Sequence, residues 1–238
     1  MKSWAEKAKA AGAQPTGAVA HLAATVVLLR EEPGGIEVLM LRRSSKMAFH
    51  GGSWVFPGGR VDDEDWDAGG DVFAAARRAA VREAREEAGL VVDVETLVHL
   101  SNWTTPEISP KRFATWFFAA EAGEGDAEAD GVETDEHRWF RPDDALDVHA
   151  RGEIELAPPQ YVTLLALREF ATVVEALEAV AAAEPFDFSP RFHFLDDGVA
   201  LCVYAEDVAW DDVARLDEPG PHHRLLMADT GWVYERDH

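Results

Sequence analysis

Three glutamates near the middle of the chain, Glu83, Glu86 and Glu87, have the residue type and spacing from which metal chemistry could arise. Their i, i+3, i+4 spacing puts all three carboxylates on one face if the segment is helical. Carboxylates this close together repel one another unless a cation neutralises them. Hard divalent cations such as Mg²⁺ and Mn²⁺ prefer oxygen ligands, whereas zinc favours nitrogen and sulfur. The pattern therefore predicts a Mg²⁺ or Mn²⁺ site.

A solvated helix face is the alternative, because runs of Arg and Glu usually face water. In that case Arg82 and Glu86 would form only an i, i+4 ion pair, which contributes about 0.2–0.5 kcal/mol. Two features outside the run favour a site. A Pro-Gly-Gly turn at residues 57–59 precedes the segment, and Gly89 follows it directly.

One helix over residues 73–88 is predicted to position the glutamates, because the run is rich in Ala, Arg and Glu. Asp71 can cap its first turn after the break at Gly69-Gly70. Gly89 stands where a left-handed residue would end it. The opposite side of the helix is expected to face a core and is lined by Val72, Phe73, Ala76, Ala80 and Ala84.

The stretch Pro57–Leu90 resembles the signature of the Nudix hydrolase family, G-x5-E-x7-R-E-U-x-E-E-x-G-U, in which U is apolar. Gly59 matches the first glycine, and the second half is matched position for position by Arg82, Glu83, Ala84, Glu86, Glu87, Gly89 and Leu90. Two features depart from the signature. Asp65 stands where the family has the longer Glu, which leaves open whether it anchors the helix. Residues 66–81 fill sixteen positions where the pattern has seven, and the Gly- and Asp-rich stretch WDAGGDVF at residues 66–73 is expected to lengthen the loop before the helix.

The resemblance implies an α/β fold, the Nudix α/β/α sandwich with a mixed sheet, over residues 17–150. Residues 1–16 are expected to form an N-terminal arm. Residues 151–238 are expected to form a C-terminal extension of helix and strand packed on that domain.

The resemblance also implies the chemistry: hydrolysis of a phosphoanhydride, X-P-P-Y plus water giving X-P and P-Y. The implied metal ligands are the Gly58 carbonyl, Glu83, Glu86, Glu87 and Glu133. Such metals would bridge phosphate oxygens and lower the pKa of the attacking water. Glu83 is expected to be the general base, with Glu133 as runner-up. Arg82 should hold a carboxylate in place rather than react.

Glu133 enters this set because Nudix enzymes commonly supply one more acid from a loop before a strand that carries Trp. Glu133 lies six residues before Trp139, in the acidic, Gly/Ala-rich segment 121–136. Glu136 is the alternative. A solvated acid is equally consistent with a segment so rich in charge.

The substrate is expected to be a small diphosphate. Arg42, Arg43 and Lys46 form the densest basic patch, just before the Pro-Gly-Gly turn, and could bind its phosphates. Trp103, in a polar loop, could stack on a planar ligand such as adenine.

The region 42–65, the long insertion, the WTTPE loop and the C-terminal helix resemble the coenzyme A diphosphatase branch related to the mammalian peroxisomal enzyme. Met47-Ala48 depart from the CoA motif of that branch. ADP-ribose and NADH are the alternative substrates. A non-catalytic, nucleotide-binding regulatory Nudix domain is the alternative of another class.

The composition also limits the classes of molecule that the protein can bind. The 238 residues include 45 acidic and 22 basic side chains, a formal charge of −23, which would repel nucleic-acid polymers. No window reaches the roughly 20 apolar residues of a membrane span, and the N-terminus lacks a signal peptide's apolar core. The single cysteine, Cys202, lies in an apolar run and is expected to be a buried structural thiol. We expect a cytoplasmic protein, with a homodimer as an open possibility.

The remaining predicted elements follow from apolar periodicity and turn residues. Predicted helices are residues 142–150 and one long helix over 158–184. His222-His223 is expected to lie in a loop rather than in a metal site. Predicted strands are residues 21–30 and 36–42, joined by a hairpin turn, then 91–100, 112–120, 137–140, 191–195, 199–204 and 225–227.

Overall fold

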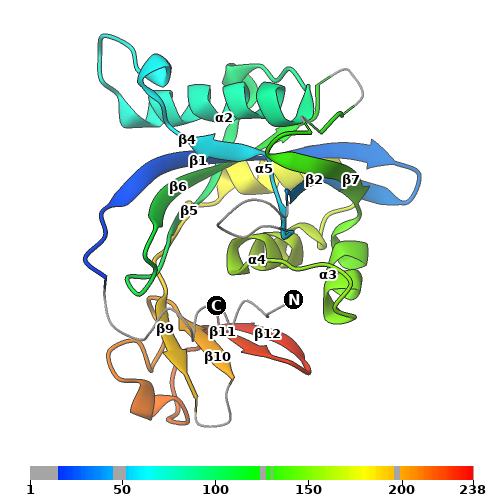
Figure 1. Cartoon of the computed structure of the whole chain (residues 1–238). Helices are drawn as coiled ribbons and strands as arrows, with labels where there is room; N and C mark the ends of the chain where they lie inside the picture. Colours follow the sequence, from blue (N-terminus) through cyan, green and yellow to red (C-terminus); the bar gives the residue numbers. More distant parts are fainter. Residues whose placement is uncertain (1–15, 45–51, 124–126, 130, 196–198, 238) are drawn as a thin grey trace. The chain divides into compact units, whose positions relative to one another are not determined.

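The computed structural model describes residues 16–44, 52–123, 127–129, 131–195 and 199–237. The chain divides into two compact units that alternate along the sequence (Figure 1). The larger, here the sheet–helix unit, comprises residues 22–102 and 115–186. The smaller, here the small β unit, comprises residues 1–21, 103–114 and 187–238. Lys46, predicted to bind phosphate, lies outside the described residues.

A mixed sheet carries most of the strands. Its strands run in the order β3-β2-β1-β6-β5-β8, with β4 paired to β1 and β7 paired to β2. The predicted hairpin joins β1 to β2, whose antiparallel register runs from Leu29↔Val38 to Glu32↔Gly35. The bounds are β1 (Ala20–Glu32), β2 (Gly35–Arg43), β3 (Trp54–Val55), β4 (Gly58–Arg60), β5 (Val98–Thr104), β6 (Arg112–Glu121), β7 (Thr134–Phe140) and β8 (Phe186–Phe188).

Both faces of the sheet are covered in the sheet–helix unit. On β1, Val26 and Leu28 pack in one cluster with the alanines of α2 (Val72–Ala88). The alternating residue Val27 is also inaccessible to solvent, although it points to the opposite face. Helix α2 covers one face, while α3 (Pro142–Ala150) and α4 (Pro158–Leu167) lie on the other side (Figure 1). The predicted α/β/α sandwich with a mixed sheet is confirmed.

Helix α2 begins and ends as its sequence predicts. The Asp71 carboxylate accepts a hydrogen bond from the Phe73 amide, and Gly89 adopts φ 69°, a left-handed conformation suited to glycine. The face toward the sheet consists almost entirely of alanines, which allow the helix and the strands to approach closely. They are Ala75, Ala76, Ala79, Ala80, Ala84 and Ala88. Val72, predicted to face the core, is instead 38% exposed because it lies in the first turn.

The helix predicted over residues 158–184 is wrong in extent: two helices, α4 and α5 (Val173–Ala182), occupy the segment. A capping box starts the second helix. The Thr172 hydroxyl accepts from the Glu175 amide, and the Glu175 carboxylate accepts from the Thr172 amide, both at 3.2 Å. These local hydrogen bonds divide a segment whose apolar periodicity is continuous. No helix in the described part of the chain is long and apolar enough to cross a bilayer.

The strand predicted over residues 91–100 starts late, at Val98, where β5 begins. The Asp93 carboxylate accepts from the Glu95 amide and caps a 3₁₀ turn over Val94–Thr96. That side-chain hydrogen bond competes with strand pairing.

The small β unit contains a four-stranded antiparallel sheet, in the order β12-β11-β10-β9. Its strands are β9 (Arg191–Phe194), β10 (Ala200–Val203), β11 (His223–Ala228) and β12 (Gly231–Arg236). The first three coincide with predicted runs, whereas β12 is additional. His223, predicted to lie in a loop, is instead the first residue of β11, and its ring contacts the Tyr234 hydroxyl at 2.9 Å. Cys202 is buried, as predicted.

One buried ion pair lies within the small β unit. Arg224 donates to both carboxylate oxygens of Asp207, at 2.7 and 2.9 Å, and the two side chains are 5% and 0% exposed. Asp207 also accepts from the amides of His223 and Ala209, each at 2.7 Å. Burial opposes ionisation of Asp207, but these donors outweigh it and hold its pKa below the usual value. The pair therefore ties β11 to the loop after β10.

Removing one partner of this pair should destabilise the small β unit. Asp207→Ala leaves the Arg224 guanidinium buried and unpaired, so we expect the free energy of unfolding to fall by about 3–5 kcal/mol. Asp211→Ala is the matched control, because Asp211 is 84% exposed and pairs with Arg191 at the surface. The control should change stability by less than about 1 kcal/mol. Denaturant unfolding followed by tryptophan fluorescence measures both, and equal effects would contradict the assignment.

Candidate active site

Two consecutive glycines bring the chain against the glutamates of α2. The Gly58 amide donates to Glu87 Oε2 at 2.9 Å. A Cβ placed on Gly59 would lie 2.2 Å from Glu83 Oε1, so a larger residue could not occupy this position without displacing that carboxylate. Strand β4 is held by pairing with β1, where Thr25 faces Gly58. The glycine turn and α2 therefore bring main-chain groups and carboxylates close together.

Glu87 is buried, at 6% exposure. Burial raises its pKa to about 8, although the hydrogen bond from Gly58 acts in the opposite direction. The negative charges of Glu83 and Glu133 raise the pKa further, and the positive charge of Arg43 lowers it. The pKa of this one carboxylate thus depends on residues from α2, from the segment before β7 and from the end of β2.

The pKa of Glu83 is raised as well. Burial raises its pKa, the hydrogen bond and charge of Arg82 lower it, and the charges of Glu86 and Glu133 raise it again. The two glutamates and their acidic neighbours therefore repel each other within a partly desolvated site. A cation would relieve this repulsion.

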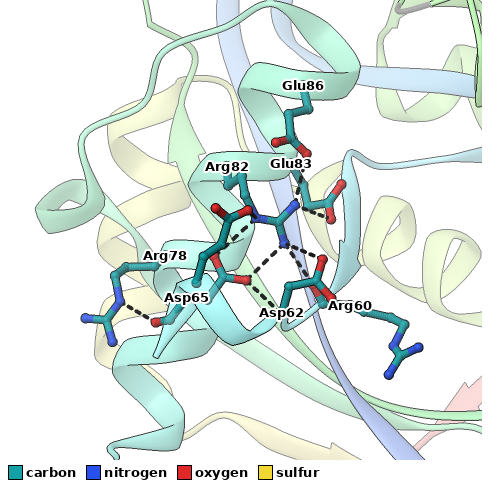
Figure 2. A network of polar contacts seen from close by, with 8 residues as sticks. Arg60, Asp62, Asp65, Arg78, Arg82, Glu83 and Glu86 are labelled. Atoms are coloured by element: carbon teal, nitrogen blue, oxygen red, sulfur yellow. Dashed lines mark hydrogen bonds and ion pairs between the residues drawn. The ribbon is translucent and has the colours of Figure 1, made fainter. Parts of the chain in front are cut away.

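Arg82 lies at the centre of a polar network (Figure 2). Its guanidinium donates to Asp65 at 3.0 and 3.2 Å, to Glu83 at 2.8 Å and to Glu86 at 2.9 Å. It also donates to the Arg60 carbonyl at 2.9 Å. The bond to Asp65 is the strongest of the influences that raise the pKa of Arg82. The network fixes the Glu83 carboxylate in place, as the sequence predicts for Arg82.

Asp65 does anchor α2, which settles the question left open by its identity. It is 3% exposed and ends a 3₁₀ turn over Asp63–Asp65, where it also accepts from the Asp62 amide at 2.8 Å. The turn carries the short side chain to Arg82, so the missing methylene of a glutamate is not needed. The extra residues are divided as predicted: α2 begins at Val72, and the residues before it lengthen the loop.

Glu133 lies at the surface just before β7, and its carbonyl accepts from the Ser44 amide at 2.7 Å. Its charge acts on both Glu83 and Glu87. The alternative, Glu136, is instead paired with Arg42 at 2.7 Å and with Arg138 at 3.4 Å. Of these two acids, Glu133 is therefore the one whose charge acts on the glutamates of α2.

The two basic residues of the predicted patch that the structure describes differ in their surroundings. Arg42 is paired with Asp135 and Glu136, each at 2.7 Å. Arg43 acts on Glu87 through its charge, and its buried Nε has no hydrogen-bond partner among the described residues.

Trp103, predicted to stack on a ligand, is a core residue of the small β unit. It is 5% exposed, and its ring stacks on Phe188 with centroids 4.0 Å apart and planes 5° apart. Tyr204 meets it edge-on at 5.9 Å. The prediction is wrong because apolar packing in this unit, invisible in the local sequence, already covers the indole.

The donor set suits a hard divalent cation. The side chains are carboxylates, and the Gly58-Gly59 turn brings main-chain groups beside them. Among the described residues, no three acidic, histidine or cysteine side chains converge into a ready-made cage. Two of the candidate ligands, Glu83 and Glu86, are directed to Arg82 instead. Each of these hydrogen bonds uses one carboxylate oxygen, Oε1 of Glu83 and Oε2 of Glu86, so the second oxygen of each could bind a cation.

Comparisons with known proteins agree with this geometry. The model of the NUDIX domain family matches residues 19–159. A structure described as a NUDIX hydrolase from Alicyclobacillus acidocaldarius superposes with a TM-score of 0.64 at 23% identity. It covers 71% of this chain and 100% of that one, which shows a shared fold.

Two curated proteins from Caenorhabditis elegans are similar in sequence. The putative nudix hydrolase 7 is 28% identical over 168 residues, 56% of each chain. The peroxisomal coenzyme A diphosphatase ndx-8 is 38% identical over 86 residues, 35% of this chain and 34% of that one. The chain thus spans about half or less of the length of these relatives. The family match covers more than half of the chain and includes the glycine turn and all four glutamates. The chain therefore belongs to the Nudix hydrolases, a family of pyrophosphohydrolases.

Proposed function

We propose that this protein hydrolyses the phosphoanhydride bond of a small organic or nucleoside diphosphate with the help of Mg²⁺ or Mn²⁺. The observation that carries the proposal is the carboxylate cluster at the Gly58-Gly59 turn. There, Glu83 and Glu87 are partly desolvated and repel each other and Glu133. Such an arrangement is costly unless it serves to bind a cation.

Within this proposal, Glu86, Glu87, Glu133 and the Gly58 carbonyl hold the metal, together with Glu83. When bound, the metal neutralises phosphate oxygens and lowers the pKa of the attacking water. Glu83 accepts the proton of that water, and Glu133 is the second candidate for this role. Arg82 positions the Glu83 carboxylate through its 2.8 Å hydrogen bond.

Coenzyme A and its acyl esters are the substrates we propose first. The support is the partial similarity to the C. elegans coenzyme A diphosphatase and the resemblance of residues 42–65 to that branch. ADP-ribose and NADH come second. Because Phe188 already covers the Trp103 ring, the described residues offer no specific support for adenine recognition.

A regulatory domain that binds a nucleotide without turnover is the rival function. Such a domain could lose members of the carboxylate set without consequence. Here the acids and the Arg82 network are all present, which favours an enzyme.

Metal removal and loss of one carboxylate should both abolish turnover. We expect EDTA to stop diphosphate hydrolysis and Mg²⁺ or Mn²⁺ to restore it. Glu87→Gln should slow kcat by roughly a hundredfold or more, because it removes a metal ligand. Folding should survive, because the change reduces repulsion. Glu95→Gln is the control, since Glu95 is 78% exposed on a 3₁₀ turn. A Glu87→Gln protein with near-native turnover would refute the proposed site.

Stability of the metal-free protein should fall as pH rises from about 4.5 toward 8. The pKa of Glu87 is raised from 4.5 to about 8, so between these values the folded state binds more protons than the unfolded state. That advantage is complete at low pH and is lost as pH passes through the folded value. Mg²⁺ should raise Tm most at the alkaline end, where the carboxylates are free to bind it.

Thermal unfolding between pH 5 and 8.5, with and without Mg²⁺, measures this effect. Glu87→Gln removes the titrating group and should flatten the decline in Tm. If the variant keeps the wild-type slope, Glu87 does not cause it.

Direct competition should establish the substrate. With CoA, ADP-ribose and NADH under one set of conditions, we expect kcat/KM to be highest for CoA, with release of 3′,5′-ADP and 4′-phosphopantetheine. A tenfold preference for either nucleotide, about 1.4 kcal/mol, would reverse the order.

A further inference from the structure

Two adjacent arginines at the end of β2 have opposite surroundings. Arg42 is neutralised by Asp135 and Glu136, each at 2.7 Å, on a partly exposed surface. Arg43, the next residue, forms no ion pair with a described residue, and its Nε is buried without a hydrogen-bond partner in the described part of the chain. The difference follows from strand geometry, since consecutive side chains point to opposite faces.

The backbone of Arg43 is fixed on both sides. Its amide donates to the Ser53 carbonyl at 3.0 Å, and its carbonyl accepts from the Gly52 amide at 2.8 Å. Across the sheet it is paired with Thr134, the first residue of β7. The neighbouring Ser44 amide donates to the Glu133 carbonyl at 2.7 Å. Arg43 is therefore held directly beside the segment that supplies the fourth acid.

A buried guanidinium N–H without an acceptor is unfavourable, because it has lost its water without gaining a protein partner. The Glu87 carboxylate accepts instead from the Gly58 amide. Yet Arg43 is close enough for its charge to act on Glu87. The guanidinium thus lies within electrostatic reach of Glu87, and its Nε has no acceptor among the described residues.

We propose that Arg43, and not Arg42, binds the diphosphate of the substrate by donating hydrogen bonds to non-bridging phosphate oxygens. This inference rests on the proposed function, because it concerns the same site. A doubly charged phosphate group approaching several carboxylates is repelled unless positive charge lies on its path. Arg43 supplies that charge from the protein itself, and its planar fork of donors matches a phosphate. It is a substrate-binding residue, distinct from the acids that hold the metal.

Binding of methylenediphosphonate, a diphosphate analogue that cannot be hydrolysed at its bridge, tests the inference without relying on turnover. Calorimetric titration in the presence of Mn²⁺ should show at least about tenfold weaker binding for Arg43→Gln than for the wild type. Arg43→Lys, which keeps the charge but loses the fork, should fall between them. Arg42→Gln should weaken binding by no more than about threefold, because its guanidinium is already held by two acids.

A separate Mn²⁺ titration without the analogue excludes a merely structural role. Arg43→Gln should bind Mn²⁺ at least as tightly as the wild type, since it removes a positive charge beside the carboxylates. Weaker Mn²⁺ binding together with a lower Tm would show that Arg43 only maintains the fold. Unchanged analogue binding in Arg43→Gln, or an equal loss in Arg42→Gln, would also overturn the inference. If the wild type binds the analogue through Arg43 but hydrolyses no diphosphate, the proposed function fails and the inference stands.

Discussion

Repulsion among carboxylates is the constraint to which the sheet–helix unit is adapted. Three glutamates lie within five consecutive residues of one helix, and the charge of Glu133, in the segment before β7, acts on two of them. Burial and the charges of acidic neighbours raise the pKa of Glu83 and of Glu87. Three groups offset this cost. The Arg82 guanidinium and the Gly58 amide donate hydrogen bonds to the carboxylates, and Arg43 contributes a positive charge.

Small residues make this arrangement possible. The alanine face of α2 allows the helix to lie close to the sheet, and the lack of a side chain at Gly59 leaves room for the Glu83 carboxylate. Both features work at the same place, because β4 pairs with β1 directly beside the helix. A larger residue at Gly59 would displace the Glu83 carboxylate from the turn.

Sequence reasoning is most successful here where the cause is local. The ends of α2 follow from Asp71 and Gly89, and the shared face of the glutamates follows from helical spacing. The anchoring role of Asp65 could not be deduced, because it depends on a 3₁₀ turn that brings a short side chain to Arg82. The prediction for Trp103 is wrong for a related reason. Its stacking partner Phe188 is distant in sequence, and only the tertiary structure reveals that the ring is covered. The different fates of Arg42 and Arg43 also required the structure, because Asp135 and Glu136 lie where only Arg42 meets them.

Because the two units alternate along the chain, a single cut cannot separate them. The chain leaves and re-enters the sheet–helix unit, and residues 103–114 of the small β unit are the tip of a hairpin whose strands β5 and β6 continue into the larger one. Neither unit is a single contiguous stretch of coding sequence. A chain truncated after residue 186 would retain Trp103 but lose the Phe188 ring that covers it. Residues 187–238 therefore supply the rings that cover an indole of the hairpin, and their removal would leave it uncovered.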